Sequence, residues 1–212
     1  MKPERIARQS GHPSGWFGEI VARVMAFDTL PANRIAEREL GLRAGEAVIE
    51  VGCGSGWTLR RLAASGAGFL AGVDGSEVMV RLARRRLRRR IAEGNAEVSL
   101  ATSDALPYPA ASFDAALAVH VVYFWANPLA DLREIHRVLR PGGRVLLGYR
   151  PRDEQAEAAL PASVYTLRTI GETVELLQKA GFETTSSTTH PLGGGVYTEA
   201  GSAASACSSR GR

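Results

Sequence analysis

Residues 47–56 read AVIEVGCGSG, an apolar run that passes directly into three closely spaced glycines. The segment Ala47 to Val51 has the length and the β-branched content of a buried strand. The glycines let the backbone adopt positive φ and let a ligand approach the main chain. The helix predicted at about 57–65 would present its free N–H groups to the same loop. The stretch therefore predicts a strand, a glycine loop and a helix that together receive a ligand, with a plain tight turn as the alternative.

The loop departs from the dinucleotide fingerprint G-x-G-x-x-G, which needs glycine at position 57, where the sequence has Trp57. A bulky residue there would crowd a pyrophosphate. The loop therefore favours a smaller, uncharged linkage and disfavours a nicotinamide-dependent reductase.

Outward from this stretch, strand-like and helix-like segments alternate. Strands are expected at 47–51, 68–73, 96–101, 115–119 and 144–148, and helices at 57–65, 76–93, 128–139 and 169–180. Such alternation predicts parallel strands joined by crossover helices on both faces. The expected fold class is α/β, a Rossmann-like, doubly wound, mostly parallel sheet.

We expect three regions along the chain. Residues 1–40 form an N-terminal helical segment that lies over the substrate as a lid, because an apolar helical face runs from Trp16 to Met25 ahead of the first core strand. The alternative is that this helix packs on the outside of the sheet. A second short helix in it is predicted from Pro31 to Leu40. Residues 41–190 form the ligand-binding domain. Residues 191–212, rich in Gly, Ser and Ala, form a weak edge strand and a flexible tail.

Composition is that of an ordinary globular protein. A chain of 212 residues with 45% hydrophobic content can build one full α/β core. No apolar run approaches about 18 residues and no signal peptide is recognisable, so we expect a cytoplasmic protein without a membrane segment. The two cysteines and four histidines do not have the spacing of zinc ligands, so no metal is expected.

Basic charge is concentrated in one segment. Seven arginines lie between Arg81 and Arg90, and without them the formal net charge of +4 would be −3. They occupy mostly the faces opposite the apolar residues of a predicted helix, which indicates a solvated surface. Binding to nucleic acid is the alternative, and it is not the partner we expect.

An acid follows the second predicted strand. Asp74 lies 22 residues past Gly52, where a carboxylate can accept both ribose hydroxyls of an adenosine. Gly75 beside it leaves room for a ring. Asp74 could instead cap the following helix, although Ser76 can also do this.

Three further motifs complete a pattern that extends from about Ala44 to Arg150. They are Ser103-Asp104-Ala105 followed by Leu106-Pro107, then Ser112-Phe113-Asp114, and Leu139-Arg140-Pro141-Gly142-Gly143. With the glycine loop and Val73-Asp74-Gly75-Ser76, the sequence resembles the class I S-adenosylmethionine-dependent methyltransferases, especially the small-molecule group known from ubiquinone biosynthesis. The resemblance implies S-adenosyl-L-methionine as the cofactor.

The resemblance also implies a site, residue by residue. The cofactor-binding residues it implies are Glu50, Gly52, Cys53, Gly54, Gly56, Asp74, Gly75, Ser103, Asp104, Ala105 and His120. Glu50 and the loop backbone would hold the methionine part, Asp74 the ribose, and Asp104 the adenine amino group. His120 would face both the methionine part and the substrate.

The function expected is in-line methyl transfer to a small, apolar or aromatic metabolite. The candidates for a general base are His120, His12 and Tyr123. No Asn-Pro-Pro-Tyr or Asp-Pro-Pro-Tyr tetrapeptide follows the fourth strand, which counts against amide and adenine N-methyltransferases. Two alternatives stay open: an S-adenosylmethionine-binding protein of the same fold with cyclase-like chemistry, and an RNA-directed methyltransferase. The sequence leaves the oligomeric state open.

Overall fold

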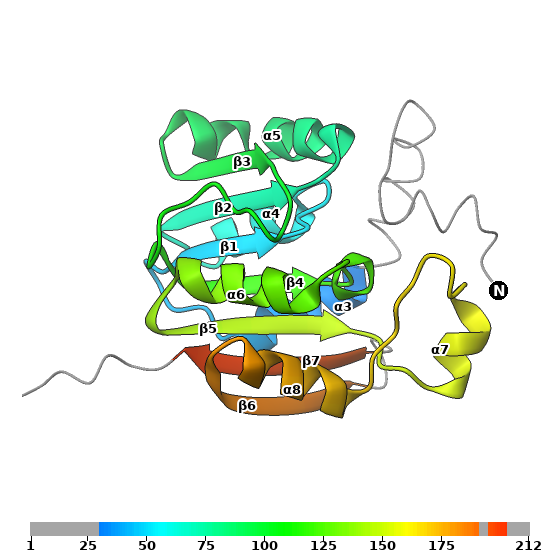
Figure 1. Ribbon diagram of the computed structural model, residues 1–212. Coiled ribbons are helices and arrows are strands. Elements are labelled where there is room, and N and C mark those ends of the chain that lie inside the picture. Colours follow the sequence, from blue (N-terminus) through cyan, green and yellow to red (C-terminus); the bar gives the residue numbers. More distant parts are fainter. Residues whose placement is uncertain (1–29, 191–194, 203–212) are drawn as a thin grey trace, which may run out of the picture.

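The centre of the fold is a seven-stranded sheet, and the computed structural model describes it within residues 30–190 and 195–202 (Figure 1). The strands are β1 (Ala47–Val51), β2 (Phe69–Asp74), β3 (Ala96–Leu100), β4 (Phe113–Val119), β5 (Leu139–Tyr149), β6 (Phe182–His190) and β7 (Gly195–Ser202). Their order is β3-β2-β1-β4-β5-β7-β6. Strands β1 to β5 are parallel, and β7 is antiparallel to both of its neighbours. The predicted Rossmann-like, mostly parallel sheet is confirmed.

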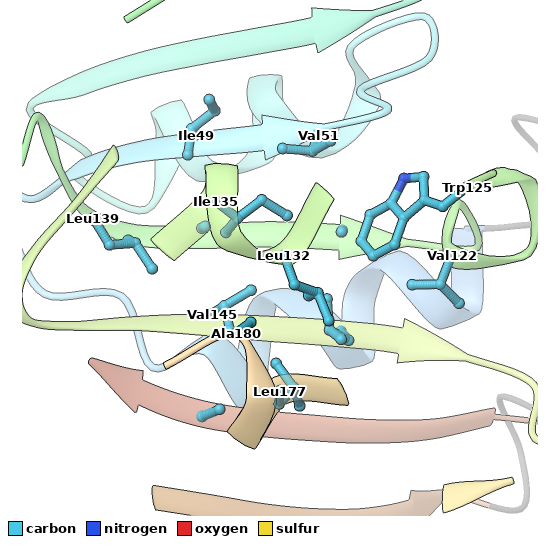
Figure 2. Close-up of a cluster of buried hydrophobic side chains, with 14 of the residues drawn as sticks. Ile49, Val51, Val122, Trp125, Leu132, Ile135, Leu139, Val145, Leu177 and Ala180 are labelled. Carbon is cyan, nitrogen blue, oxygen red and sulfur yellow. The ribbon is translucent and has the colours of Figure 1, made fainter. Parts of the chain in front are cut away.

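Helices cover both faces of this sheet, as Figure 1 shows. One face carries α3 (Leu30–Leu40), α4 (Trp57–Ala64) and α5 (Glu77–Ala92), and the other carries α6 (Pro128–Val138) and α8 (Ile170–Lys179). A short 3-10 turn, η1 (Val122–Phe124), follows β4, and α7 (Glu154–Ala159) follows β5. Each face has its own apolar core. Figure 2 shows the α6 side, where Leu132 and Ile135 of α6 pack with Ile49 of β1. Every helix in the described part of the chain is too short or too polar to cross a bilayer.

Side-chain caps start the helices close to where the sequence predicts. The Ser76 hydroxyl accepts from the Met79 N–H at the start of α5, at 3.4 Å. At the start of α8, Thr169 and Glu172 form a capping box in which each side chain accepts from the other's backbone N–H. These local signals explain why the predicted bounds of these two helices hold to within one or two residues.

The N-terminal helix α3 belongs to the core, which fits the alternative that this part of the segment packs on the sheet, and the lid over residues 1–29 stays a prediction. Ala32, Ala36 and Leu40 are buried in the core cluster on the α4 side of the sheet. The guanidinium of Arg144 on β5 donates to the carbonyls of Leu40 and Gly41, at 2.8 and 3.1 Å, so the end of the helix is tied to the sheet. Apolar contact and these hydrogen bonds place α3 on the face of the sheet rather than over its strand ends. The apolar face from Trp16 to Met25 lies outside the described residues.

The last strand also differs from its prediction. We expected a weak edge strand after residue 191, whereas β7 lies between β5 and β6, and β6 forms the edge. The polar sequence suits this interior place because the buried hydroxyl of Thr198 pairs with hydroxyls on the two neighbouring strands. Thr198 is fully buried, and its Oγ1 lies 3.2 Å from the Tyr149 hydroxyl and 2.9 Å from the Ser187 hydroxyl. The tail expected at 203–212 lies outside the described residues.

The arginines of α5 are only partly a solvated surface. Three of the seven donate to backbone carbonyls of neighbouring segments: Arg84 to Val98, Arg86 to Ser55 and Arg90 to Ala67. The other four, namely Arg81, Arg85, Arg88 and Arg89, are exposed. The helix therefore uses part of its charge to hold itself against β3 and the loops beside it.

Candidate functional site

The predicted site residues meet at one edge of the sheet, where the parallel strands β1 to β4 end (Figure 1). The glycine loop follows β1, Asp74 ends β2, residues 101–105 follow β3, and His120 follows β4. In open α/β sheets, ligands bind outside this edge. Sequence and topology therefore agree on where the site lies.

Two glycines of the loop are needed for different reasons. A Cβ at Gly52 would lie 2.1 Å from Cγ1 of Val121, so only glycine lets the segment after β4 pack against the loop. This contact brings the neighbouring His120 to the glycine loop. Gly54 has φ of +52°, and a Cβ built there would meet nothing within 4 Å. The backbone at Gly54 therefore faces open space that a ligand can occupy.

Asp74 ties three segments of the site together. Its Oδ2 accepts from the Gly54 N–H at 2.8 Å and its Oδ1 accepts from the Ser76 N–H at 2.9 Å. Ser76 itself caps α5, so Asp74 is not needed as the helix cap. Each carboxylate oxygen has two lone pairs, so Asp74 can hold the loop and still accept a hydroxyl from a ligand.

Glu50 is a buried carboxyl beside the loop, 3% exposed. Burial raises its pKa to about 8; hydrogen bonds from the Thr58 side chain and the Leu59 backbone oppose that shift, and the charge of Asp74 adds to it. These bonds place Glu50 at the start of α4, where backbone N–H groups lack helical partners. Its Oε2 is buried and has no hydrogen-bond partner among the described residues. A ligand ammonium group would fit there, because it supplies both a donor and an opposite charge.

This environment predicts how stability depends on pH. The unfolded carboxyl loses its proton near pH 4.5 and the folded one near pH 8, so the wild-type protein loses stability as pH rises between these values. The slope from this group is up to about 1.4 kcal/mol per pH unit. A Glu50→Gln variant lacks this titration. Its free energy of unfolding should therefore rise relative to that of the wild type from pH 5 to pH 8, measured by urea unfolding without cofactor. A difference that does not change with pH would contradict the assignment.

The segment after β3 is anchored by α6. Ser103 donates its hydroxyl proton to Asp131, a buried carboxyl that is 4% exposed and whose pKa is raised by burial. Glu134 accepts from the Leu106 N–H at 2.9 Å. Asp104 is exposed beside these anchors. Sequence reasoning missed Asp131 and Glu134, although their spacing of three residues on the predicted helix is a usable signal.

His120 and Tyr123, two of the predicted catalytic residues, form a pair. His120 is a non-glycine residue with φ of +57°, and its Nδ1 lies 3.0 Å from the Tyr123 hydroxyl. That hydroxyl also accepts from the Arg150 N–H, and burial raises the Tyr123 pKa. Tyr165, from the segment before α8, packs against the Tyr123 ring with centroids 5.7 Å apart. The structure thus fixes the orientation of both side chains in the pair.

The third predicted catalytic residue, His12, lies outside the described residues. Trp125, which follows the His120–Tyr123 pair in the sequence, is buried in the core cluster shown in Figure 2.

The chain is similar in sequence to known proteins. A family described as a methyltransferase domain matches residues 49–147. An uncharacterized methyltransferase of Bacillus subtilis, YdaC, is 28% identical over 141 residues, which cover 65% of this chain and 74% of that protein. Demethylmenaquinone methyltransferase of Tropheryma whipplei is 39% identical over 54% of this chain, and 27-O-demethylrifamycin SV methyltransferase of Amycolatopsis mediterranei is 34% identical over 55%. The aligned segments span only 46% and 44% of these two relatives.

Solved structures share the fold. A chain from the complex between the Haloferax volcanii Trm112 methyltransferase activator and a methyltransferase superposes with a TM-score of 0.74 at 20% identity, over 86% of this chain and 93% of that chain. The [4+2]-cyclase SpnF superposes with a TM-score of 0.69 at 19% identity, over 95% of this chain and 92% of that chain. Open space at Gly54, the unpaired oxygen of Glu50 and the placement of Asp74 fit the parts of the family's cofactor. Residues 49–147 match a methyltransferase domain, and the chain is similar to the class I S-adenosylmethionine-dependent methyltransferases, whose cofactor is S-adenosylmethionine.

Proposed function

We propose that the protein transfers a methyl group to a nucleophilic atom of a small, apolar or aromatic metabolite. The observation that carries this proposal is the His120–Tyr123 pair, held beside the glycine loop by the contact of Val121 with Gly52. The names of two relatives support the substrate class, because demethylmenaquinone and a rifamycin are both small molecules. The aromatic rings of Phe124 and Tyr165, with centroids 5.2 Å apart, both pack against the ring of Tyr123.

Different residues of the site would bind different parts of the cofactor. When bound, the cofactor supplies an electrophilic methyl group on a sulfonium, and its loss leaves a neutral sulfur. Glu50 and the glycine loop would hold the amino-acid end, Asp74 would accept the ribose hydroxyls, and Asp104 would bind the adenine. Holding the nucleophile and the methyl carbon in line can supply about 7–11 kcal/mol of the barrier reduction.

His120 takes the proton that a hydroxyl nucleophile loses. In the tautomer whose Nδ1–H donates to the Tyr123 hydroxyl, Nε2 is the basic nitrogen. The Tyr123 hydroxyl is itself positioned by the Arg150 N–H, so the imidazole cannot rotate without losing a hydrogen bond. Tyr123 acts in this scheme through its positioning of His120, because burial raises its pKa and keeps its hydroxyl neutral.

A metabolite screen with His120 variants tests the proposal. Wild-type protein is incubated with methyl-labelled S-adenosylmethionine and a library of small aromatic hydroxyl compounds, and labelled products are identified. For a hydroxyl substrate, His120→Ala should lower kcat by about 10²–10⁴-fold, a larger change than the one it causes in the cofactor Kd. Tyr123→Phe should shift the pH profile of kcat. Cofactor binding without transfer to any compound would favour cyclase-like chemistry, and transfer only to RNA would favour the RNA-directed alternative; either outcome overturns the proposal.

Asp74→Ala should weaken cofactor binding by at least ~10-fold, because charge-assisted hydrogen bonds of ~1.5–3 kcal/mol each are lost. Calorimetry with S-adenosylmethionine and with adenosine checks this, since both ligands carry the ribose. Glu50→Gln serves as the comparison and should weaken only the ligand that has the amino-acid end. An unchanged Kd in Asp74→Ala would contradict the ribose assignment.

A further inference from the structure

One face of α5 is packed against the glycine loop. Ala83 and Arg86 lie three residues apart on this helix, so they share a face. A Cβ at Gly56 would lie 3.0 Å from the Cβ of Ala83, which shows how closely α5 approaches the loop. From the next turn of α5, Arg86 donates through Nη1 to the carbonyl oxygen of Ser55.

The same arginine also contacts the residue that sets this loop apart from a dinucleotide-binding loop. The guanidinium carbon of Arg86 lies 4.1 Å from the centroid of the Trp57 ring. A cation over the face of an indole is attracted by the ring quadrupole, and partial burial strengthens the attraction. Arg86 is partly buried, and this burial, with the nearby charge of Arg60, lowers its pKa. Arg86 therefore has two partners in the loop, a carbonyl and an indole.

These contacts complete the set that fixes the loop. The Gly54 N–H is held by Asp74, and the Gly56 N–H donates to the Cys53 carbonyl at 2.9 Å. Ser55 and Trp57, the residues on either side of Gly56, are held by Arg86.

We propose that Arg86 is a positioning residue of the cofactor site, which holds residues 55–57 in the conformation that receives the methionine end of S-adenosylmethionine. The inference rests on the proposed assignment of the glycine loop to that end. It explains why this chain has tryptophan at position 57: the indole serves as the surface on which the guanidinium lies. It also separates Arg86 in function from its exposed neighbours on the same helix.

The test compares matched variants of the full chain. Arg86→Met keeps the apolar stem and removes the guanidinium, and Arg85→Met makes the same charge change at an exposed neighbouring position. We expect Arg86→Met to raise the Kd and KM for S-adenosylmethionine by about 10-fold, with kcat within a factor of two or three. The Kd for adenosine, which lacks the methionine end, should change less. Arg86→Lys should be intermediate, because lysine keeps a cation but loses the planar donor fork.

A second readout does not depend on the cofactor. Hydrogen exchange of the backbone amides at residues 54–57, measured without cofactor, should be faster in Arg86→Met and unchanged in Arg85→Met. Trp57→Leu should raise the same exchange rates, and combining it with Arg86→Met should add little, since the two residues act together. Equal exchange in wild type and Arg86→Met, or equal Kd values, would overturn the inference. A wild-type protein that does not bind S-adenosylmethionine would overturn the proposed function instead, and the exchange rates would still decide the role of Arg86.

Discussion

Replacing Gly54 with valine should abolish binding of S-adenosylmethionine while the protein still folds. A Cβ at Gly54 meets no protein atom within 4 Å, so the new side chain does not collide with the fold. It projects instead into the open space at the loop, which the cofactor needs in order to touch the main chain. The expected result is loss of the calorimetric binding signal with a cooperative thermal transition retained.

A matched variant separates loss of binding from backbone strain. Gly54 has φ of +52°, and a non-glycine residue there costs about 1–2 kcal/mol. Gly94 has φ of +74°, equally has nothing within 4 Å of its Cβ, and precedes β3 at the other end of the parallel strands. Gly94→Val should therefore lose a similar amount of stability and bind the cofactor as the wild type does. If Gly54→Val folds and binds normally, the loop is only a turn.

The part of the site that the sequence predicted is the part that depends on local signals and on chain direction. The glycine loop and Asp74 each end a strand that the apolar pattern identifies, and parallel strands bring their carboxyl ends to the same edge. The distance along the sequence does not matter for this placement. Asp74 accepts from the Gly54 N–H, 20 residues away in the sequence, because β1 and β2 are neighbouring strands in register. The positions of these residues could therefore be inferred without side-chain coordinates.

Features that depend on a distant partner could not be inferred in this way. The polar composition of β7 indicated an edge strand, because the partners of the Thr198 hydroxyl, Tyr149 and Ser187, lie on other strands. The arginine run indicated a solvated face, because nothing in the spacing shows that Arg86 meets an indole and a carbonyl in the glycine loop. The left-handed backbone at His120 could not be predicted either, because the residue is not a glycine. For Thr198 and Arg86, the deciding energy comes from contacts with other segments of the chain.

The N-terminal helix gives the second prediction with a large effect: deleting residues 1–40 should abolish cooperative folding. Deletion removes three buried side chains from α3 and exposes the apolar surfaces of α4 and the sheet that they cover. It also removes the Leu40 carbonyl, which accepts from Arg144, and Glu37, whose Oε2 lies 2.6 Å from Nε of Arg61. Burial of Leu40 alone contributes about 1.5–3 kcal/mol, against a typical total of about 5–15 kcal/mol.

Deleting residues 1–29 is the matched comparison, because it leaves α3 and its contacts in place. This shorter deletion should keep a cooperative thermal transition and bind S-adenosylmethionine within about tenfold of the wild type, since the site residues from Glu50 to His120 and the core that supports them are retained. Turnover should fall if the apolar face from Trp16 to Met25 covers the substrate, because water then reaches the reacting atoms. Calorimetric unfolding and a methyl-transfer assay on both deletions distinguish these effects. Cooperative unfolding and normal cofactor binding in the protein that lacks residues 1–40 would show that α3 is dispensable and would restore the lid interpretation for the whole segment.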